Sequence, residues 1–179
     1  MARRAKDWKK SEKVKEREEQ LKKKEEYVMK RNARFYDSLH KYEKFAGLAH
    51  GHSTEKEIKN LTLLADNVLQ KVRDEFGPTK VNSGFRHPDV NSAVGGSKTS
   101  DHCKGMAADI EVPGVPNADL AQWIVDNCEF RQVILEFYTP GIPDSGWVHV
   151  SYNIDDNKKQ ILTAMRENGR TVYKTGLVI

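Results

Sequence analysis

The pattern of apolar and polar residues divides the chain into a charged N-terminal part and a part with the periodicities of a folded domain. Residues 2–46 contain no Pro or Gly and consist mainly of Lys, Glu, Arg and Gln, which favours one long charged helix. Its apolar residues form a single column with a spacing of seven: Val14, Leu21, Val28, Phe35 and Tyr42. Charged residues hold the positions of the second column that a coiled coil needs, so this stripe is too narrow to join two helices firmly.

A second helix is predicted after the glycine at position 47. Apolar residues recur at steps of three and four from Ile58 to Val72, the spacing of a helix with one buried face. Thr54 and Glu57 form a plausible capping box before this run, and Gly77 ends it.

The rest of the chain predicts short strands joined by loops. We expect strands around Val81 and over 107–112, 132–138 and 147–152, a helix over 118–126 capped by Asn117, and a hairpin of 161–166 with 171–175. Asn168 and Gly169 are typical of the two-residue turn of such a hairpin. Because hairpins outnumber strand–helix–strand crossovers, we predict an α+β domain with a small antiparallel sheet and flanking helices.

Charge follows the same division of the chain. Residues 1–34 carry 14 Lys and Arg against 7 Asp and Glu, a net charge of +7; the remaining 16 (30 − 14) basic and 19 (26 − 7) acidic residues give −3. We therefore predict a basic helical arm, residues 1–50, and a domain over 51–179. The arm is interpreted as a solvated helix, as a docking segment through which residues 1–46 bind a protein partner or a second copy, or as a nucleic-acid arm. Interleaved Glu residues make nucleic acid the least expected of these partners.

Hydropathy indicates no membrane segment. No apolar run approaches the roughly 18 residues of a membrane span, and the basic N-terminus leads into further charge instead of an apolar signal-peptide core. We expect no membrane partner and synthesis in the cytoplasm without export by the general route.

Two histidines and an aspartate are candidates for metal binding. His102 and Asp109 lie seven residues apart across a glycine turn, and His149 lies in the later predicted strand GWVHVSY. A catalytic zinc site uses three such nitrogen and oxygen ligands and keeps one position open. On spacing alone, a surface salt bridge with a packed imidazole explains these residues equally well.

The wider motif resembles the zinc D-Ala-D-Ala carboxypeptidase family, whose members include phage endolysins and vancomycin-resistance dipeptidases. The resemblance covers about residues 78–152 and rests on SGFRHPDVNSAVGGSKTSDHCKGMAADI followed by GWVHVSY. It implies a fold like that of DD-peptidases and Hedgehog domains, a zinc cofactor held by His102, Asp109 and His149, and a peptidoglycan peptide as the substrate. It also implies that Arg86 binds a carbonyl or carboxylate of the substrate, with a surface ion pair as the alternative. Ser100 is either a substrate-binding residue or a loop cap.

The chain departs from the family at the catalytic carboxylate. Many relatives place a Glu three residues before the last zinc histidine, and Gly146 holds that position here. We predict Glu136 as the general base, because a hairpin centred near residue 142 would pair Glu136 with His149. Asp144 is the rival, and a structural carboxylate is the alternative to both.

The sequence therefore predicts a zinc metallopeptidase that cleaves peptidoglycan stem peptides, as a D-Ala-D-Ala carboxypeptidase or an endopeptidase for an L-to-D bond. A phage origin, with release at lysis or a place in the virion, would fit the missing export signal. The alternatives are a structural or wall-anchoring virion component attached through the N-terminal helix, and a related zinc domain without peptidase activity.

Overall fold

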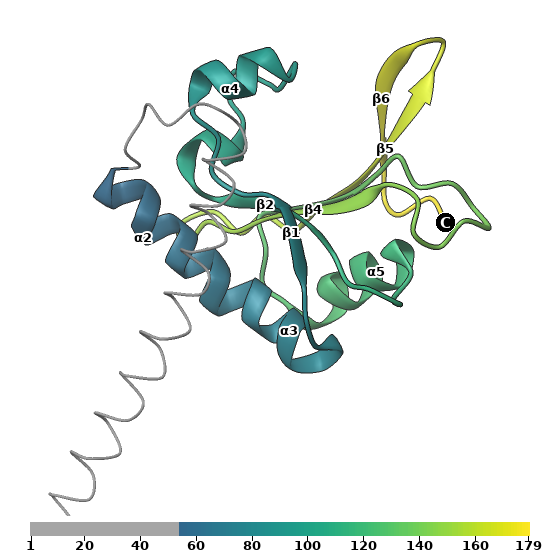
Figure 1. Ribbon diagram of the computed structural model, residues 1–179, viewed down its shortest axis with the longest axis horizontal. Helices are drawn as coiled ribbons and strands as arrows, with labels where there is room; N and C mark the ends of the chain where they lie inside the picture. The colour runs from purple at the N-terminus through teal and green to yellow at the C-terminus, as the bar shows by residue number, and fades with distance from the viewer. Residues whose placement is uncertain (1–53) are drawn as a thin grey trace, which may run out of the picture. The chain divides into compact units, whose positions relative to one another are not determined.

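The domain is built on one six-stranded sheet with helices on both faces (Figure 1). The computed structural model describes residues 54–179; the expected helical arm, residues 1–50, and its partner-binding residues 1–46 lie outside the described residues. The boundary between arm and domain stays a prediction. The strands are β1 (Lys80–Ser83), β2 (Ala107–Glu111), β3 (Gln132–Glu136), β4 (Trp147–Ser151), β5 (Gln160–Glu167) and β6 (Arg170–Thr175), in the order β1-β2-β4-β3-β5-β6. Their positions agree with the strands predicted from the alternation of the sequence.

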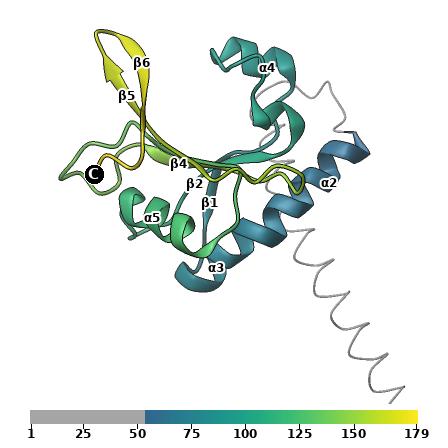
Figure 2. The ribbon, with the colours of Figure 1, turned by 180° about the vertical axis from the view of Figure 1, so that it is seen from behind.

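A continuous helix and α5 (Asn117–Asn127) cover one face of the sheet (Figures 1 and 2). The helix runs through α2 (Glu55–Leu64), the π-helical turn η1 (Ala65–Leu69) and α3 (Gln70–Phe76). The predicted capping box is confirmed, since the backbone N–H of Thr54 donates to the Glu57 carboxylate at 2.7 Å. The helix ends at Gly77, whose φ of 90° favours glycine.

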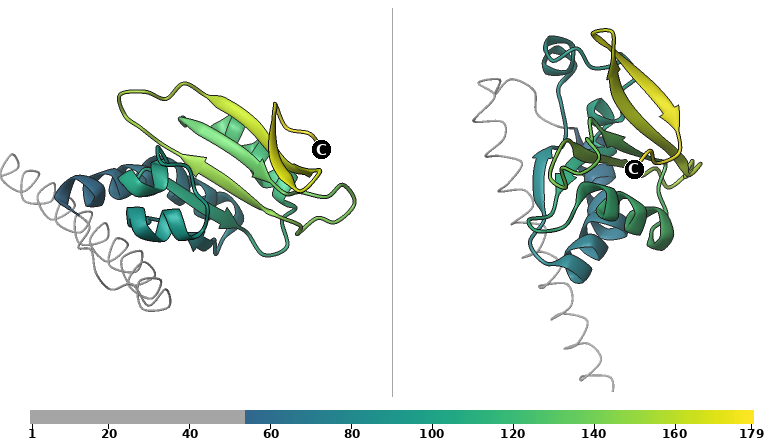
Figure 3. Two further views of the ribbon diagram at one scale, coloured as in Figure 1. Left: turned by 90° about the horizontal axis from the view of Figure 1, so that it is seen from above. Right: turned by 90° about the vertical axis from the view of Figure 1, so that its right-hand side faces the viewer.

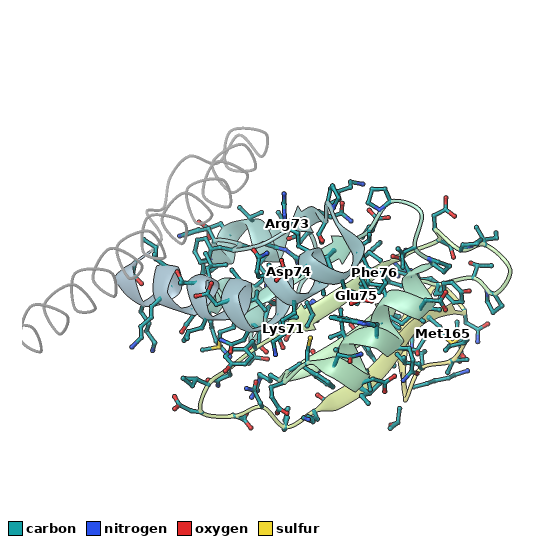
Figure 4. The ribbon with its side chains drawn as sticks, turned by 90° about the horizontal axis from the view of Figure 1, so that it is seen from below. Lys71, Arg73, Asp74, Glu75, Phe76 and Met165 are labelled. Carbon is teal, nitrogen blue, oxygen red and sulfur yellow. The ribbon has the colours of Figure 1, made fainter. Side chains whose placement is uncertain are left out.

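The main hydrophobic core lies between these helices and the sheet. Its fully buried side chains are Leu64, Val68, Val72, Ile110, Leu120, Ile124, Phe130, Val133, Leu135, Val148 and Val150. At the end of the helix layer, the rings of Phe76 in α3 and Trp123 in α5 pack in a T-shaped arrangement, with 5.3 Å between centroids. Figures 3 and 4 show this layer from further sides, and Figure 4 labels Phe76 at the end of α3 beside α5.

Asn117 is not the cap of α5, contrary to the prediction from the sequence. Pro116 is the N-cap, and Asn117 is the first, buried residue of the helix. Its side-chain amide donates to the carbonyl oxygens of Ser145 at 3.2 Å and Gly146 at 3.1 Å. Asn117 therefore fixes the loop that leads into β4 on the helix layer.

The sheet is mixed, so the prediction of a wholly antiparallel sheet was wrong in one pair. β5 runs parallel to β3, while the other four strand pairs are antiparallel. The cause is topological. β4 has β2 and β3 on its two sides, so the chain that reverses after β4 cannot pair with β4. It adds at the free edge of β3, where it runs in the same direction as β3. The β5–β6 hairpin turns at Asn168 and Gly169, both with positive φ, as predicted.

Two short helices lie against the other face of the sheet. α4 (Pro88–Ala93) and the 3-10 helix η2 (Asp101–Lys104) fill the connection between β1 and β2. Figure 1 shows α4 on the side of the sheet opposite α3 and α5, and the β5–β6 hairpin rises on the same side as α4. Among residues 54–179, no helix combines the length and the hydropathy that a membrane span requires.

Candidate metal centre and active site

The candidate centre lies on the sheet face that the main helix layer leaves uncovered. Asp109 in β2 and His149 in β4 are directly paired across the two strands, so their side chains share a face. His102 comes from η2, which ends at Gly105 with a φ of 67°. A Cβ at Gly105 would lie 2.5 Å from the carbonyl oxygen of Glu57, so this glycine lets the η2 segment pack closely on α2.

Three ligand atoms converge at this centre. His102 Nε2 lies 3.1 Å from Asp109 Oδ1 and 3.1 Å from His149 Nδ1, and His149 Nδ1 lies 2.9 Å from Asp109 Oδ1. All three residues are buried, with exposed fractions of 2, 6 and 7% for His102, Asp109 and His149. They form the one group of metal-ligand type found within residues 54–179.

The protonation of His102 is fixed by the backbone. Its Nδ1 lies 2.6 Å from the carbonyl oxygen of Gly84, which has no hydrogen of its own to give, so Nδ1–H donates and Nε2 keeps its lone pair. Burial, opposed in part by Asp109, lowers the pKa of His102. Burial alone would raise the pKa of Asp109, but contacts with both histidines outweigh it and hold that pKa below its usual range. An unprotonated Nε2 and an ionised carboxylate therefore face each other.

This arrangement fits a zinc ion. The ligand atoms of a tetrahedral zinc site, with bonds of about 2.0–2.1 Å, lie about 3.3 Å apart, and the three atoms here lie 2.9–3.1 Å apart. In the tautomer of His149 whose Nδ1 carries no hydrogen, three lone pairs converge in a buried site, where a cation between them would offset their repulsion. Two imidazoles and one carboxylate are also the ligand types of catalytic zinc sites. His102, Asp109 and His149 are thus the residues that could hold the metal.

Arg86 lies against the same three residues. Its Nε donates to Ser83 Oγ at 2.7 Å, and its Nη2 lies 2.6 Å from Asp109 Oδ2 and 3.1 Å from His102 Nε2. The side chain is only 18% exposed, so Arg86 is part of the centre and not of a surface ion pair. Within the described part of the chain, Nη1 has no hydrogen-bond partner. The guanidinium can therefore offer a free N–H to a substrate.

Glu136 reaches the same face by a register that differs from the prediction. It pairs with Trp147, and Ile134 pairs with His149, so the expected direct pairing of Glu136 with His149 was wrong. The shift is two residues, and an even shift keeps Glu136 on the face of His149. Burial raises the pKa of Glu136, the charge of Asp109 adds to this effect, and His149 and Arg86 oppose it. The carboxylate thus lies within electrostatic reach of the centre.

Gly146 cannot carry the glutamate that relatives place there. Its φ is 68°, and a Cβ would lie 1.8 Å from the carbonyl oxygen of Glu136 and 2.8 Å from the carbonyl carbon of Phe137. The backbone before β4 thus presses directly on the end of β3. Glu136 is the carboxylate that this close contact leaves beside the centre, whereas Asp144 is exposed in the loop between the strands.

Ser100 acts locally as the N-cap of η2, because its Oγ accepts from the backbone N–H of His102 at 3.3 Å. A contact of Ser100 with substrate stays a prediction, as do the catalytic roles of Glu136 and Arg86. Sequence reasoning missed the Gly84 carbonyl, which orients His102 from 18 residues away. Gly84 belongs to the SGFR motif, but the residue type does not show that its backbone carbonyl accepts a hydrogen bond from His102.

Comparison with known proteins agrees with this geometry. A family model described as Peptidase M15 matches residues 41–151, a range that includes all three candidate ligands, Arg86 and Glu136. No curated protein matches the chain.

Proposed function

The chain belongs to the peptidase M15 family, and from this premise we propose that it is a zinc-dependent peptidase that hydrolyses an amide bond in peptidoglycan stem peptides. The bond is the terminal D-Ala-D-Ala bond or an internal L-to-D bond. The observation that carries the proposal is the convergence of three buried ligand atoms, within 3.1 Å of one another, beside Arg86. A zinc ion at this centre would polarise the scissile carbonyl and lower the pKa of a water molecule to about 7.

Glu136 is proposed as the group that moves the proton. The Glu136 carboxylate accepts a proton from the attacking water. It then gives this proton to the nitrogen of the leaving amine, so that a neutral amine departs as the amide bond breaks. The raised pKa of Glu136, caused first by burial, supports this role because it brings the carboxyl closer to the working pH.

Arg86 is proposed to bind the oxygen on which negative charge develops, or a carboxylate of the substrate. Its Nε and Nη2 are held by Ser83 and Asp109, which fixes the plane of the guanidinium, and Nη1 remains available for substrate. A preoriented cation costs no reorganisation when the charge appears, so it stabilises the transition state more than a mobile Lys would.

Digestion of purified peptidoglycan tests the proposed function. Muropeptide analysis by mass spectrometry should show new amine and carboxyl ends that vanish with chelator and return with zinc, and the masses identify the bond that is cleaved. Glu136→Gln should lower turnover by about 100-fold or more while zinc content stays at one ion per chain. Binding to the wall without new ends would refute the peptidase and favour the alternative of a wall-anchoring module.

A further inference from the structure

The β5–β6 hairpin lies beyond the residues that the family model matches, yet it continues the sheet beside the strand that carries Glu136. β5 pairs with β3 in a register that puts Ala164 opposite Glu136, and Tyr173 of β6 lies opposite Ala164. Directly paired residues share a face, so Trp147, Glu136, Ala164 and Tyr173 form one row across four strands on the side of the metal centre. Ala164, which lies between Glu136 and Tyr173 in this row, is small and fully buried.

Tyr173 is close to Glu136 and open to a ligand. Its side chain is 56% exposed, and no hydrogen bond of its hydroxyl occurs within residues 54–179. Burial raises the pKa of Tyr173, and the negative charge of Glu136 raises it further, which agrees with the row geometry. An exposed phenol beside a catalytic carboxylate is placed to contact a bound peptide.

Arg166 presents a guanidinium without a carboxylate partner on the same face. It pairs with Thr171, and its Nη1 donates to Thr171 Oγ1 at 3.1 Å. The guanidinium carbon lies 4.9 Å from the centre of the Phe137 ring, an ordinary cation–π distance. Among the described residues, no Asp or Glu forms an ion pair with Arg166. The Arg166 guanidinium is therefore held in place by neutral groups, so its positive charge can pair with a carboxylate of a bound ligand.

Phe137 links this cation to the strand of His149. A regular strand would turn Phe137 away from the face of Glu136, but its φ of 55° interrupts the alternation. Its ring packs against Trp147 in a T-shaped arrangement, with 5.4 Å between centroids, and the Arg166 guanidinium lies over the Phe137 ring. Trp147, Phe137 and Arg166 are thus in contact, and Tyr173 lies diagonally across from Arg166 on the same face. We name these four residues the hairpin subsite.

We propose that the hairpin subsite binds the part of the peptide substrate remote from Arg86 and that Arg166 recognises a free carboxylate on it. The inference rests on the proposed peptidase function. Arg86 lies beyond β1, at one end of the strand order, and Arg166 lies in β5 on the other side of the metal centre. Two strand spacings across and four residues along place the Cα of Arg166 about 16 Å from that of His149. This span corresponds to about four to five residues of extended peptide, so the subsite would bind a residue of the substrate away from the scissile bond.

Two synthetic stem peptides that differ at one group test the inference. Each peptide carries one carboxylate about four to five residues from the scissile bond, free in one peptide and amidated in the other, and kcat/KM is measured for both with the zinc-loaded full chain. The wild type should prefer the free acid by about 10-fold, the effect of one charged hydrogen bond, and Arg166→Gln should abolish the preference. Arg170→Gln is the matched control, because Arg170 lies in the same hairpin but on the opposite face. It should keep the wild-type preference.

Equilibrium binding of the same two peptides, followed by tryptophan fluorescence, separates the two proposals. Hydrolysis with an unchanged acid-to-amide ratio in Arg166→Gln overturns the subsite and leaves the peptidase intact. If neither the wild type nor any variant hydrolyses the peptides, the peptidase function is refuted. The subsite is still supported if the wild type and Arg170→Gln bind the free acid more tightly than the amide and Arg166→Gln does not. Equal binding of both peptides by the wild type overturns the subsite in either case. Zinc content and circular dichroism of each variant exclude misfolding as the cause.

Discussion

Gly146→Ala should be far more destabilising than a substitution of the same kind in the same loop. An added methyl carbon at position 146 would lie 1.8 Å from the carbonyl oxygen of Glu136, at a backbone φ of 68°. Gly141→Ala is the matched control, because Gly141 also has a positive φ, 83°, and a Cβ there would meet nothing within 4 Å. Both variants place an alanine at a left-handed backbone position, which is destabilising. Only Gly146→Ala also forces the added methyl group against β3.

The expected magnitude follows from these two terms. A left-handed alanine costs about 1 kcal/mol relative to glycine. The contact at Gly146 must open by more than 1 Å, since Cβ atoms do not approach other atoms closer than 3.0 Å. That movement displaces the end of β3, where the N–H of Phe137 donates to the carbonyl of Ala164 at 2.8 Å. With about 1–1.5 kcal/mol for the loss of this backbone hydrogen bond, we expect about 2–2.5 kcal/mol for Gly146→Ala and about 1 kcal/mol for Gly141→Ala.

Urea unfolding of the two variants and the wild type measures the difference. Chelator is present throughout, because bound metal would add its own stabilisation. Equal midpoints for the two variants, at an unchanged m-value, would refute the close contact. The same contact predicts that Glu136→Gln with Gly146→Glu does not regain turnover, although the second change restores the glutamate found in relatives. Recovered turnover would show that the loop accepts a side chain at this position.

Three further predictions concern charge and metal. Burial raises the pKa of Glu136, so its ionised form opposes folding above the ordinary pKa of about 4.3. In urea titrations of the metal-free protein, Glu136→Gln should therefore be more stable than the wild type at about pH 7. This difference in stability should disappear below about pH 4. The pKa of Asp101 is shifted in the opposite direction. Burial alone would raise it, but Lys104 and Arg131 outweigh burial and hold this pKa below the usual range. Asp101→Asn should therefore lower the free energy of unfolding by about 1–2 kcal/mol at pH 7, and by less as pH falls below about 3.9. Zinc at 1,000 times its Kd should stabilise the wild type by about 4 kcal/mol in calorimetry, and Asp109→Asn should remove this shift.

The sequence predicted the strands well because each has a buried face and a clear alternation. GWVHVSY puts Val148 and Val150 on the core side and His149 on the other side, as the structure does. The helix before the sheet was equally predictable, since its apolar spacing and its capping box between Thr54 and Glu57 are both local features.

The remaining features depend on contacts between distant residues. The parallel pairing of β3 with β5 follows from which sheet edge is free, and no local pattern records that. Asn117 has the residue type of a cap, but its amide is used by the Ser145 and Gly146 carbonyls 28 and 29 residues later. The hairpin centre was misplaced for a similar reason. Phe137 adopts a left-handed backbone conformation and Gly146 packs on β3. The strands therefore pair Glu136 with Trp147, two residues away from the pairing with His149 that a regular hairpin would give.

That two-residue difference matters for the chemistry proposed for Glu136. Directly paired side chains have Cβ atoms about 4.5–5.5 Å apart, close enough for a carboxylate opposite His149 to compete for the metal as a fourth ligand. At the observed register Glu136 is a diagonal neighbour of His149, about 7–8 Å away and still on the same face. In the proposed mechanism, this spacing would leave room for a water and a scissile amide between the carboxylate and the metal ligands. A general base needs that separation, whereas a ligand would close the position that catalysis requires to be open.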